Sequence, residues 1–343
     1  MTRGIAESMM PRMPKISAVV ATYNRRETLA RTMPTLLAQD ISCDDFEIIV
    51  VDDGSIDETL PYLHTIRSPC TLRVIAQSNR GAAAARNAGW RHVSSSLVIF
   101  LDDDLLCPPW LLRRHLDAHT QWPGGIIYGA TNTARESPRT LAAELTRYAS
   151  AQETRRLDRD ATRPGRDLAL DPNTSVLTDL MRRIGGFDES FGNFAETKDA
   201  AIRLRAVGLR FRYIKDAAVE QIYVKSSAHL AHDDAFAAGR NEWKLRRQHP
   251  QSRSESALAC MGNGGPVRAA LRRGFVTLPA IDSVISTLVQ ACEALSAVPT
   301  IRQAGVRLVR CRQSINFYRA AAAEAESWEA LSREFGVKLP CLM

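Results

Sequence analysis

The stretch Leu97-Val98-Ile99-Phe100-Leu101-Asp102-Asp103-Asp104 decides the fold class of this 343-residue chain. A short apolar run that ends in charge is typical of an interior strand of a parallel sheet. Ligands of open α/β sheets bind beyond the carboxyl ends of the strands. Carboxylates clustered at such an end repel one another unless a cation joins them, and hard oxygen ligands favour Mg²⁺, Mn²⁺ or Ca²⁺. The stretch therefore predicts a metal site with a diphosphate beside it; the alternative is a solvated acidic loop.

Two further apolar runs end in polar side chains and suggest one shared cleft. Residues 46–51 lead into Asp52-Asp53-Gly54-Ser55, and residues 16–21 lead into Thr22-Tyr23-Asn24. Helical patterns between these runs give a βαβ alternation, which predicts a parallel sheet. After the second run, Ser55 and Glu58 have the spacing of a capping box, so a helix is expected to begin at Ser55.

Five motifs in this order resemble a family 2 glycosyltransferase. They are AVVATYNR at 18–25, VVDDGSIDET at 50–59, NRGAAAARNAG at 79–89, FLDDD at 100–104 and IGGFDE at 184–189. The resemblance covers roughly residues 15–250 and implies a Rossmann-like glycosyltransferase A fold, α/β with a mostly parallel central sheet. It also implies a nucleotide-sugar donor, a divalent metal (Mn²⁺ or Mg²⁺) and inversion at the anomeric carbon.

The resemblance places a set of residues against the donor. In chain order they are Thr22, Tyr23, Asn24, Asp52, Asp53, Asn79, Gly81, Arg86, Asp102 and Asp103. Tyr23 is expected near the base, and an acid of the Asp52–Asp53 pair accepts the uracil N–H. Asp53 is preferred, although the sequence does not separate it from Asp52. Arg86 lies on a helix whose start attracts anions, so its guanidinium is expected to reach base or phosphate.

The resemblance also divides the acidic triplet. Asp102 lies toward the ribose or donor sugar and joins Asp104 as a metal ligand, while Asp103 is a spacer or a further donor contact. His229 follows an expected strand at 218–224 and is proposed as another metal ligand; the alternative is a surface or interfacial histidine. A metal here neutralises the diphosphate, both in the bound donor and in the leaving group.

The general base is where the chain departs from the family pattern. The matching stretch is Glu196-Thr197-Lys198-Asp199, and Thr197 stands where the family has an Asp. Threonine is no base at neutral pH, so Glu196 is preferred as the catalytic base and Asp199 comes second. A pair between Asp199 and Arg203 would instead make that acid structural. A base outside the motif also stays open.

The chain is expected to divide into three parts. Residues 1–14 resemble a disordered leader. A glycosyltransferase A catalytic domain follows at 15–228, with a nucleotide-binding half at 15–130 and an acceptor half at 131–228. A helical C-terminal extension covers 229–343. Within these parts, residues 155–167 are expected to form a mobile loop over the donor, and residues 275–301 an amphipathic helix rather than a membrane span.

Composition limits the partners. The net charge of +7 is spread along the chain, which fits anionic donors or lipid surfaces better than nucleic acid. The 7 cysteines form no C-x-x-C pair, which argues against zinc and fits a reducing cytoplasm, and no signal peptide is evident. A basic cluster at Arg240, Lys244, Arg246 and Arg247 would meet a lipid-linked acceptor or the inner face of the membrane, or form a solvated helix face.

The sequence thus predicts a metal-dependent inverting glycosyltransferase. It moves a sugar from a UDP- or dTDP-sugar to a hydroxyl of a glycan, a lipid-linked acceptor or a small molecule. The alternatives are a glycosyltransferase-like binding protein that lost turnover through Thr197, and a nucleotidyltransferase. A dehydrogenase is disfavoured because no G-x-G-x-x-G follows the first strand. Assembly into a homo-oligomer is left open.

Overall fold

The computed structural model describes residues 13–162, 170, 172–255, 258, 278, 280–327 and 330–331. Residues 1–12 of the expected leader and 163–167 of the expected mobile loop lie outside the described residues. The chain forms two compact units. Unit 1 comprises Met1–Ala130, Asp171–Gly186 and Leu209–Val219, and unit 2 comprises Thr131–Leu170, Phe187–Gly208 and Glu220–Met343. The domain boundaries expected at 130 and 228 stay predictions.

Within the described residues, unit 1 is built on a seven-stranded sheet of order β3-β2-β1-β4-β8-β6-β9. Its strands are β1 (Ile16–Thr22), β2 (Phe46–Asp52), β3 (Thr71–Ala76), β4 (Leu97–Asp102), β6 (Ile126–Tyr128), β8 (Thr174–Leu177) and β9 (Phe211–Tyr213). β1 pairs in parallel with β2 and β4, and β2 with β3, whereas β8 is antiparallel to β4 and β6. The prediction of a mostly parallel α/β sheet is confirmed.

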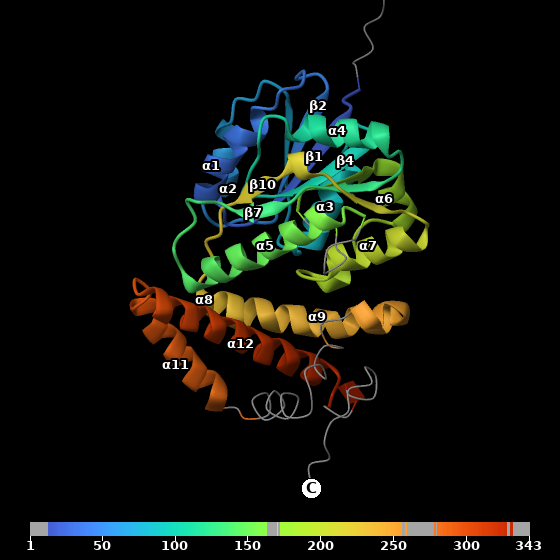
Figure 1. The fold of residues 1–343 in the computed structure, drawn as a ribbon. Helices are drawn as coiled ribbons and strands as arrows, with labels where there is room; N and C mark the ends of the chain where they lie inside the picture. The colour runs from blue at the N-terminus through green and yellow to red at the C-terminus, as the bar shows by residue number, and fades with distance from the viewer. Residues whose placement is uncertain are drawn as a thin grey trace, which may run out of the picture. The chain divides into compact units, whose positions relative to one another are not determined.

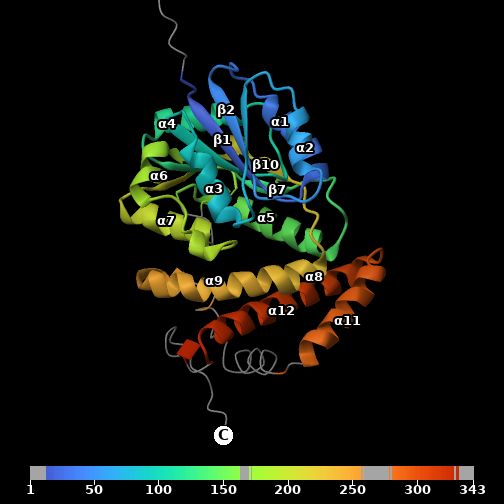
Figure 2. The same ribbon diagram turned by 180° about the vertical axis from the view of Figure 1, so that it is seen from behind.

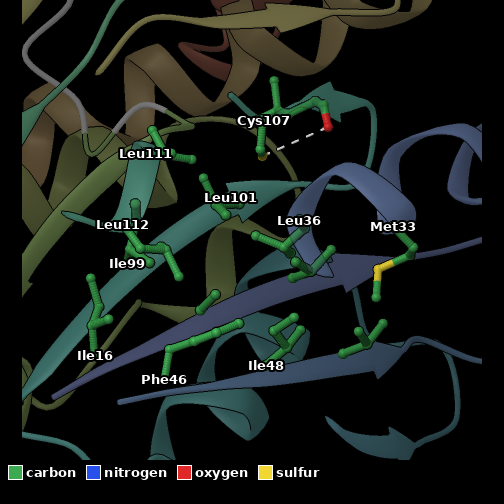
Figure 3. Packing of buried hydrophobic residues seen from close by; sticks show 14 of the residues in the cluster. Ile16, Met33, Leu36, Phe46, Ile48, Ile99, Leu101, Cys107, Leu111 and Leu112 are labelled. Carbon is green, nitrogen blue, oxygen red and sulfur yellow. Dashed lines mark hydrogen bonds between the residues drawn. The ribbon is translucent and has the colours of Figure 1, made fainter. Parts of the chain in front are cut away.

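Helices cover both faces of this sheet, which is why its central strands are apolar throughout. Side chains of α1 (Arg26–Leu37) and α4 (Leu111–Gln121) pack with one set of alternating strand residues, including Ile48 and Ile99 (Figure 3). α3 (Ala82–Arg91) covers the other face and lies in front of the strands in Figure 2. The remaining elements of unit 1 are α2 (Thr59–Thr65), β5 (Leu105–Leu106), α6 (Thr178–Ile184) and η2 (Lys215–Ala217).

Small residues let α3 approach the sheet closely. A Cβ added to Gly89 would lie 2.4 Å from Cγ1 of Val19 and 3.3 Å from Cγ2 of Val51. A larger residue would push the helix away from β1 and β2. The loop at the start of α3 is therefore held at a fixed distance from the ends of those strands.

The predicted helix start at Ser55 is wrong, because α2 begins at Thr59. The backbone N–H of Ser55 donates to Asp52 at 3.2 Å, and that of Thr59 donates to Asp57 at 3.0 Å. These two hydrogen bonds hold residues 52–59 in turns. An Asp side chain that accepts from a nearby backbone N–H stabilises a turn at the expense of a helix. Ser55 instead accepts a hydrogen bond from the backbone N–H of Asn24 at 2.8 Å.

A buried polar chain links α4 to β8 in unit 1. Asn173 Oδ1 can only accept, so His115 donates from Nε2 at 3.0 Å and its Nδ1 accepts from Ser175 Oγ at 2.7 Å. Ser175 Oγ in turn accepts from His119 Nε2 at 2.9 Å, while Asn173 donates to the Ala217 carbonyl at 2.6 Å. Burial lowers the pKa of His115 to about 3 and that of His119 to about 4. Both rings are therefore neutral in the folded protein near pH 7.

Unit 2 is mainly helical. Its described elements are β7 (Thr131–Thr133), α5 (Leu141–Arg159), η1 (Glu189–Phe191), α7 (Glu196–Ala206), α8 (Ser227–His229), the π-helix η3 (Leu230–Asp234), α9 (Ala235–Gln248), η4 (Pro250–Glu255), α11 (Ala280–Ala294) and α12 (Pro299–Glu324). β10 (Val219–Gln221) carries the chain from unit 1 into unit 2. Figures 1 and 2 show α12 running beside both α9 and α11. Gly239 of α9 permits this packing, because a Cβ there would lie 2.0 Å from the Phe317 carbonyl oxygen.

Two expectations for the helical region are corrected. The single helix expected at 275–301 is two helices, since α11 ends at Ala294 and α12 begins at Pro299, whose ring suits a first helical turn. The loop expected from residue 155 begins later, because α5 continues to Arg159. In the part of the chain that the structure describes, none of the helices combines the length and hydropathy needed to cross a bilayer.

The two neutral histidines predict a loss of stability in mild acid. Their pKa values are lowered on folding, so the unfolded chain binds more protons below about pH 6.5, and the free energy of unfolding falls as the pH drops from there toward 4. Each histidine contributes at most about 1.4 kcal/mol per pH unit. Urea unfolding between pH 7.5 and 4.5 measures this slope. His64→Gln, at an exposed position on α2, should leave the slope unchanged, whereas His119→Gln should reduce it; equal slopes in all three proteins would contradict the assignment.

Candidate functional site

The carboxyl ends of β1 and β2 are joined by Asn24, which has a left-handed backbone (φ 53°). Its N–H donates to Ser55 Oγ at 2.8 Å, and its side-chain Oδ1 accepts from the N–H of Ile56 at 2.9 Å. Asn24 was expected to contact the nucleotide; in the structure it shapes the loop that carries its neighbour Tyr23. Tyr23 itself is 42% exposed, so its ring is accessible to a ligand.

Asp103 ties β4 to β1 rather than acting as a spacer. Thr22 Oγ1 donates to its carboxylate at 2.7 Å, the Arg25 guanidinium lies 3.8 Å away, and Thr32 Oγ1 donates to its backbone carbonyl at 2.8 Å. Burial raises the pKa of Asp103 to about 6, against the opposing effects of Arg25 and Thr22. Two predicted donor residues, Thr22 and Asp103, are thus brought together, and each satisfies the other.

Asp102 and Arg86, predicted separately as donor contacts, form an ion pair. Arg86 Nη2 donates to Asp102 Oδ1 at 3.0 Å, from α3 to the end of β4. The Asp102 side chain stays 30% exposed, so part of its carboxylate remains accessible. The pair places one cation and one accessible carboxylate at the same edge of the sheet.

Asp53 and Asp52, which the sequence could not separate, have different surroundings. The Asp53 carboxylate accepts from Gln77 Nε2 at 2.7 Å and from the backbone N–H groups of Arg80 at 2.9 Å and Gly81 at 2.8 Å. These bonds hold it at the N-terminus of α3, where helix geometry favours an anion. Asp52 is 1% exposed; Oδ2 accepts the Ser55 N–H, but Oδ1 is buried with no hydrogen-bond partner among the described residues. Asp52 therefore has acceptor capacity that Asp53 has already used.

Gly54 and Gly81 make this arrangement sterically possible. Gly54 has φ +79°, and a Cβ there would lie 2.7 Å from the backbone N of Asn79. Gly81 has φ 88° directly before α3. Gly54 thus combines a positive φ with a close approach to the loop before α3. Asn79, the other predicted contact in this loop, is exposed.

The acidic triplet ends with Asp104, a buried residue in the turn between β4 and β5. No group of three His, Cys, Asp or Glu side chains suited to a metal forms among the described residues. Mg²⁺ and related hard cations are commonly held by one or two carboxylates together with substrate phosphates. The oxygen donors of Asp102 and Asp104 fit that chemistry.

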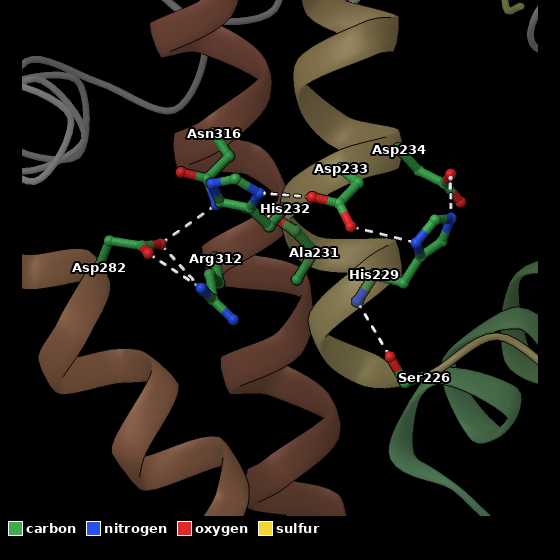
Figure 4. A network of polar contacts seen from close by, with 9 residues as sticks. All are labelled: Ser226, His229, Ala231, His232, Asp233, Asp234, Asp282, Arg312 and Asn316. Atoms are coloured by element: carbon green, nitrogen blue, oxygen red, sulfur yellow. Dashed lines mark hydrogen bonds and ion pairs between the residues drawn. The ribbon is translucent and has the colours of Figure 1, made fainter.

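His229, the third expected metal ligand, lies in unit 2 and makes other contacts. Figure 4 shows its ring between two carboxylates: Nδ1 lies 3.1 Å from Asp233 and Nε2 lies 3.2 Å from Asp234. Asp233 also contacts His232 Nδ1 at 2.7 Å. Both ring nitrogens face a carboxylate, so ligation of a metal by His229 would require the ring to leave at least one of these partners.

The two candidate bases lie on the first turn of α7, both buried. Asp199 is held on both sides: Arg203 donates from Nε at 2.8 Å and also from Nη2, and His249 Nε2 lies 2.7 Å from the other oxygen. This is the structural pairing weighed for Asp199, strengthened by a histidine that sequence reasoning missed. No spacing signal links His249 to α7, because 50 residues separate them. Glu196 begins the helix with 4% of its surface exposed.

The basic cluster expected on α9 is not one exposed surface. Arg246 is buried and donates to Glu242 at 2.8 Å and to the Ser252 carbonyl at 2.7 Å. Lys244 donates to the Ser190 carbonyl at 2.8 Å. Arg240 and Arg247 remain exposed. Helical periodicity turns neighbouring basic residues toward different sides, so the cluster in the sequence does not form a cluster in space.

Removing the Asp53 carboxylate should destabilise the fold. Asp53→Ala leaves the N–H groups of Arg80 and Gly81 without their acceptor and should lower the free energy of unfolding by about 2 kcal/mol. Urea unfolding measures the change. Asp44→Ala, in an exposed loop, is the matched control and should change it by less than about 0.5 kcal/mol. An Asp53→Ala protein as stable as this control would show that Asp53 has no such role.

Comparison with solved structures supports the fold. S. aureus TarS 1–349 in complex with UDP-GlcNAc matches with a TM-score of 0.55 at 18% identity, covering 91% of this chain and 92% of that chain. The mannosyltransferase PcManGT from Pyrobaculum calidifontis, in complex with GDP-Man and Mn2+, matches with a TM-score of 0.58 at 18% identity, covering 89% and 88%. The predicted glycosyltransferase A fold is therefore confirmed.

Sequence comparison relates part of the chain to one family. The validoxylamine A glucosyltransferase of Streptomyces hygroscopicus subsp. jinggangensis is 31% identical over 224 residues, which cover 57% of this chain and 53% of that protein. The chain thus spans about half the length of this curated relative. The model of the family "Glycosyl transferase family 2" matches residues 17–168. These residues include the three strands and the acidic edge described above, so this part of the chain is similar to glycosyl transferase family 2.

Proposed function

We propose that this chain is a metal-dependent glycosyltransferase that moves a sugar from a uridine or thymidine diphosphate sugar to an acceptor hydroxyl, with inversion. The observation that carries the proposal is the Asp52 carboxylate, buried at the end of β2 with one oxygen unpartnered among the described residues. A buried acceptor of this kind costs free energy until a donor reaches it. The match of residues 17–168 to the model of glycosyl transferase family 2 supports a sugar nucleotide as the source of that donor.

The single open oxygen of Asp52 favours uracil or thymine over guanine. These pyrimidines present one N–H at N3, flanked by carbonyls, and one acceptor oxygen is enough for it. Guanine presents two neighbouring donors, which would best suit both oxygens of one carboxylate. Asp52 Oδ2 is already bonded to the Ser55 N–H. Asp52 therefore replaces Asp53 as the proposed base contact, together with the exposed Tyr23, whose neighbour Thr22 pairs with Asp52 across β1 and β2.

The negative charge of the diphosphate has to be neutralised by groups other than the N-terminus of α3. The loop before that helix would suit a phosphate, but the Asp53 carboxylate already accepts the N–H groups of Arg80 and Gly81, the two residues before α3. We assign the diphosphate instead to the edge that carries Arg86, Asp102 and Asp104. A Mn²⁺ or Mg²⁺ ion held by the two aspartates would supply charge neutralisation of the departing diphosphate. Arg86 orients Asp102 through their ion pair.

Glu196 is the proposed general base. Asp199 is engaged by Arg203 and His249, so its carboxylate is committed to unit 2. Glu196 accepts the proton of the acceptor hydroxyl as the acceptor oxygen bonds to the anomeric carbon. The bond from that carbon to the diphosphate breaks in the same displacement, which inverts the configuration.

Calorimetric titration of UDP tests the donor site. We expect binding that needs Mn²⁺ and that weakens about tenfold or more in Asp52→Asn and in Asp104→Ala, because each loses a charge-assisted contact. Asp44→Asn, on the exposed loop, is the control and should bind like the wild type. If UDP binds neither with nor without Mn²⁺, the proposal of a uridine donor is wrong.

Turnover separates the proposed enzyme from its alternatives. With a UDP-sugar that binds, Glu196→Gln should lower transfer or donor hydrolysis by about 10²–10⁴-fold while UDP affinity stays unchanged. Asp199→Asn should chiefly lower the melting temperature, because it weakens the contacts with Arg203 and His249. A wild-type protein that binds UDP-sugars but never turns over would favour the binding protein implied by Thr197. Pyrophosphate release would favour a nucleotidyltransferase.

A further inference from the structure

The segment before Glu196 has an unfavourable backbone conformation. Phe194 (φ 65°) and Ala195 (φ 70°) are consecutive residues in the left-handed region, and neither is glycine. Side chains with a Cβ rarely adopt this conformation unless surrounding contacts impose it. Such strain is found most often at functional sites. Here it sets the direction in which the chain enters α7, whose first residue is Glu196.

One side chain of α9 supplies the contacts that hold this segment. Asn241 is 9% exposed, and its Nδ2 lies 2.9 Å from the carbonyl oxygen of Phe191, 2.6 Å from that of Asn193 and 3.0 Å from that of Phe194. An amide nitrogen has two hydrogens, so at least one is shared between carbonyls. Three convergent carbonyls around one donor group fix the curvature of the loop.

The same helix also fixes the chain on the far side of Glu196. Glu242 lies 3.5 Å from Lys198 Nζ, and His249, just beyond the end of α9, contacts Asp199 at 2.7 Å. Asn241 acts before Glu196 and these residues act after it. The chain on both sides of Glu196 is therefore held by α9 and the residue that follows it, all within unit 2.

We infer that Asn241 is a positioning residue for the reaction: it holds the loop at residues 191–195, including the left-handed Phe194 and Ala195, and so aims the Glu196 carboxylate. This inference rests on the proposed function for its catalytic consequence, but the geometric part does not need turnover. Asn241 acts on the backbone carbonyls of the loop and not on the reacting atoms. Its effect passes through the backbone of Phe194 and Ala195.

The test compares Asn241→Leu with Asn316→Leu. Asn316 is a matched control, since it is also buried and also donates to a backbone carbonyl, that of Ala231 at 2.8 Å, but it joins α12 to η3 and not to residues 191–194 (Figure 4). Hydrogen exchange should rise in peptides covering 187–199 for Asn241→Leu but not for Asn316→Leu. The kcat should fall about 10–100-fold in Asn241→Leu with the donor KM within about twofold of the wild type, because small misplacements of a base are costly.

A second variant distinguishes positioning from general loss of stability. Adding Ala195→Gly to Asn241→Leu makes the left-handed conformation easier to adopt, so it should recover part of the lost kcat. Exchange at 187–199 that is unchanged in Asn241→Leu would overturn the inference, as would a kcat loss equal to that of Asn316→Leu. If the wild type never turns over, the proposed function fails, and the exchange measurement alone decides whether Asn241 holds the segment.

Discussion

Carboxylates that are buried at the end of a parallel sheet lose their hydrogen bonds to water and need hydrogen-bond donors from the protein. This requirement determines how the loops of unit 1 are arranged. The apolar strands β1, β2 and β4 end together, so their acidic residues are crowded at one edge. The protein resolves this with a different partner for each: the start of α3 for Asp53, Thr22 for Asp103 and Arg86 for Asp102. Because the partners come from different elements, satisfying the acids also fixes the loops that carry them.

The strands and their parallel pairing could be read from the sequence because both faces of the sheet are covered and the apolar runs are continuous. The site was only partly predictable. Choosing between Asp52 and Asp53 depends on which of the two side chains points toward the loop before α3, and that follows from where α3 begins. The Asp199–His249 contact joins residues 50 positions apart, for which a single sequence contains no signal. The start of α2 was misplaced because two aspartates bind the same backbone groups that a cap would use.

The acidic triplet shows how local charge can be misread. Three adjacent aspartates suggest mutual repulsion that only a bound cation relieves. In the structure, Arg25 and Arg86 already lie beside Asp103 and Asp102. The two arginines therefore neutralise part of the negative charge of the triplet. The main role proposed for a metal is to neutralise the charge of the diphosphate rather than that of the aspartates.

The polar chain from His119 through Ser175 and His115 to Asn173 has a direction, since each member donates to the next. A substitution at one position therefore leaves the neighbouring side chain without the hydrogen-bond donor or acceptor that it needs. Ser175→Ala, for instance, would strand a donor on His119 and an acceptor on His115 at once. The four positions are therefore constrained as a group, and among relatives with this fold we expect them to be exchanged together, polar chain for apolar packing, rather than one at a time.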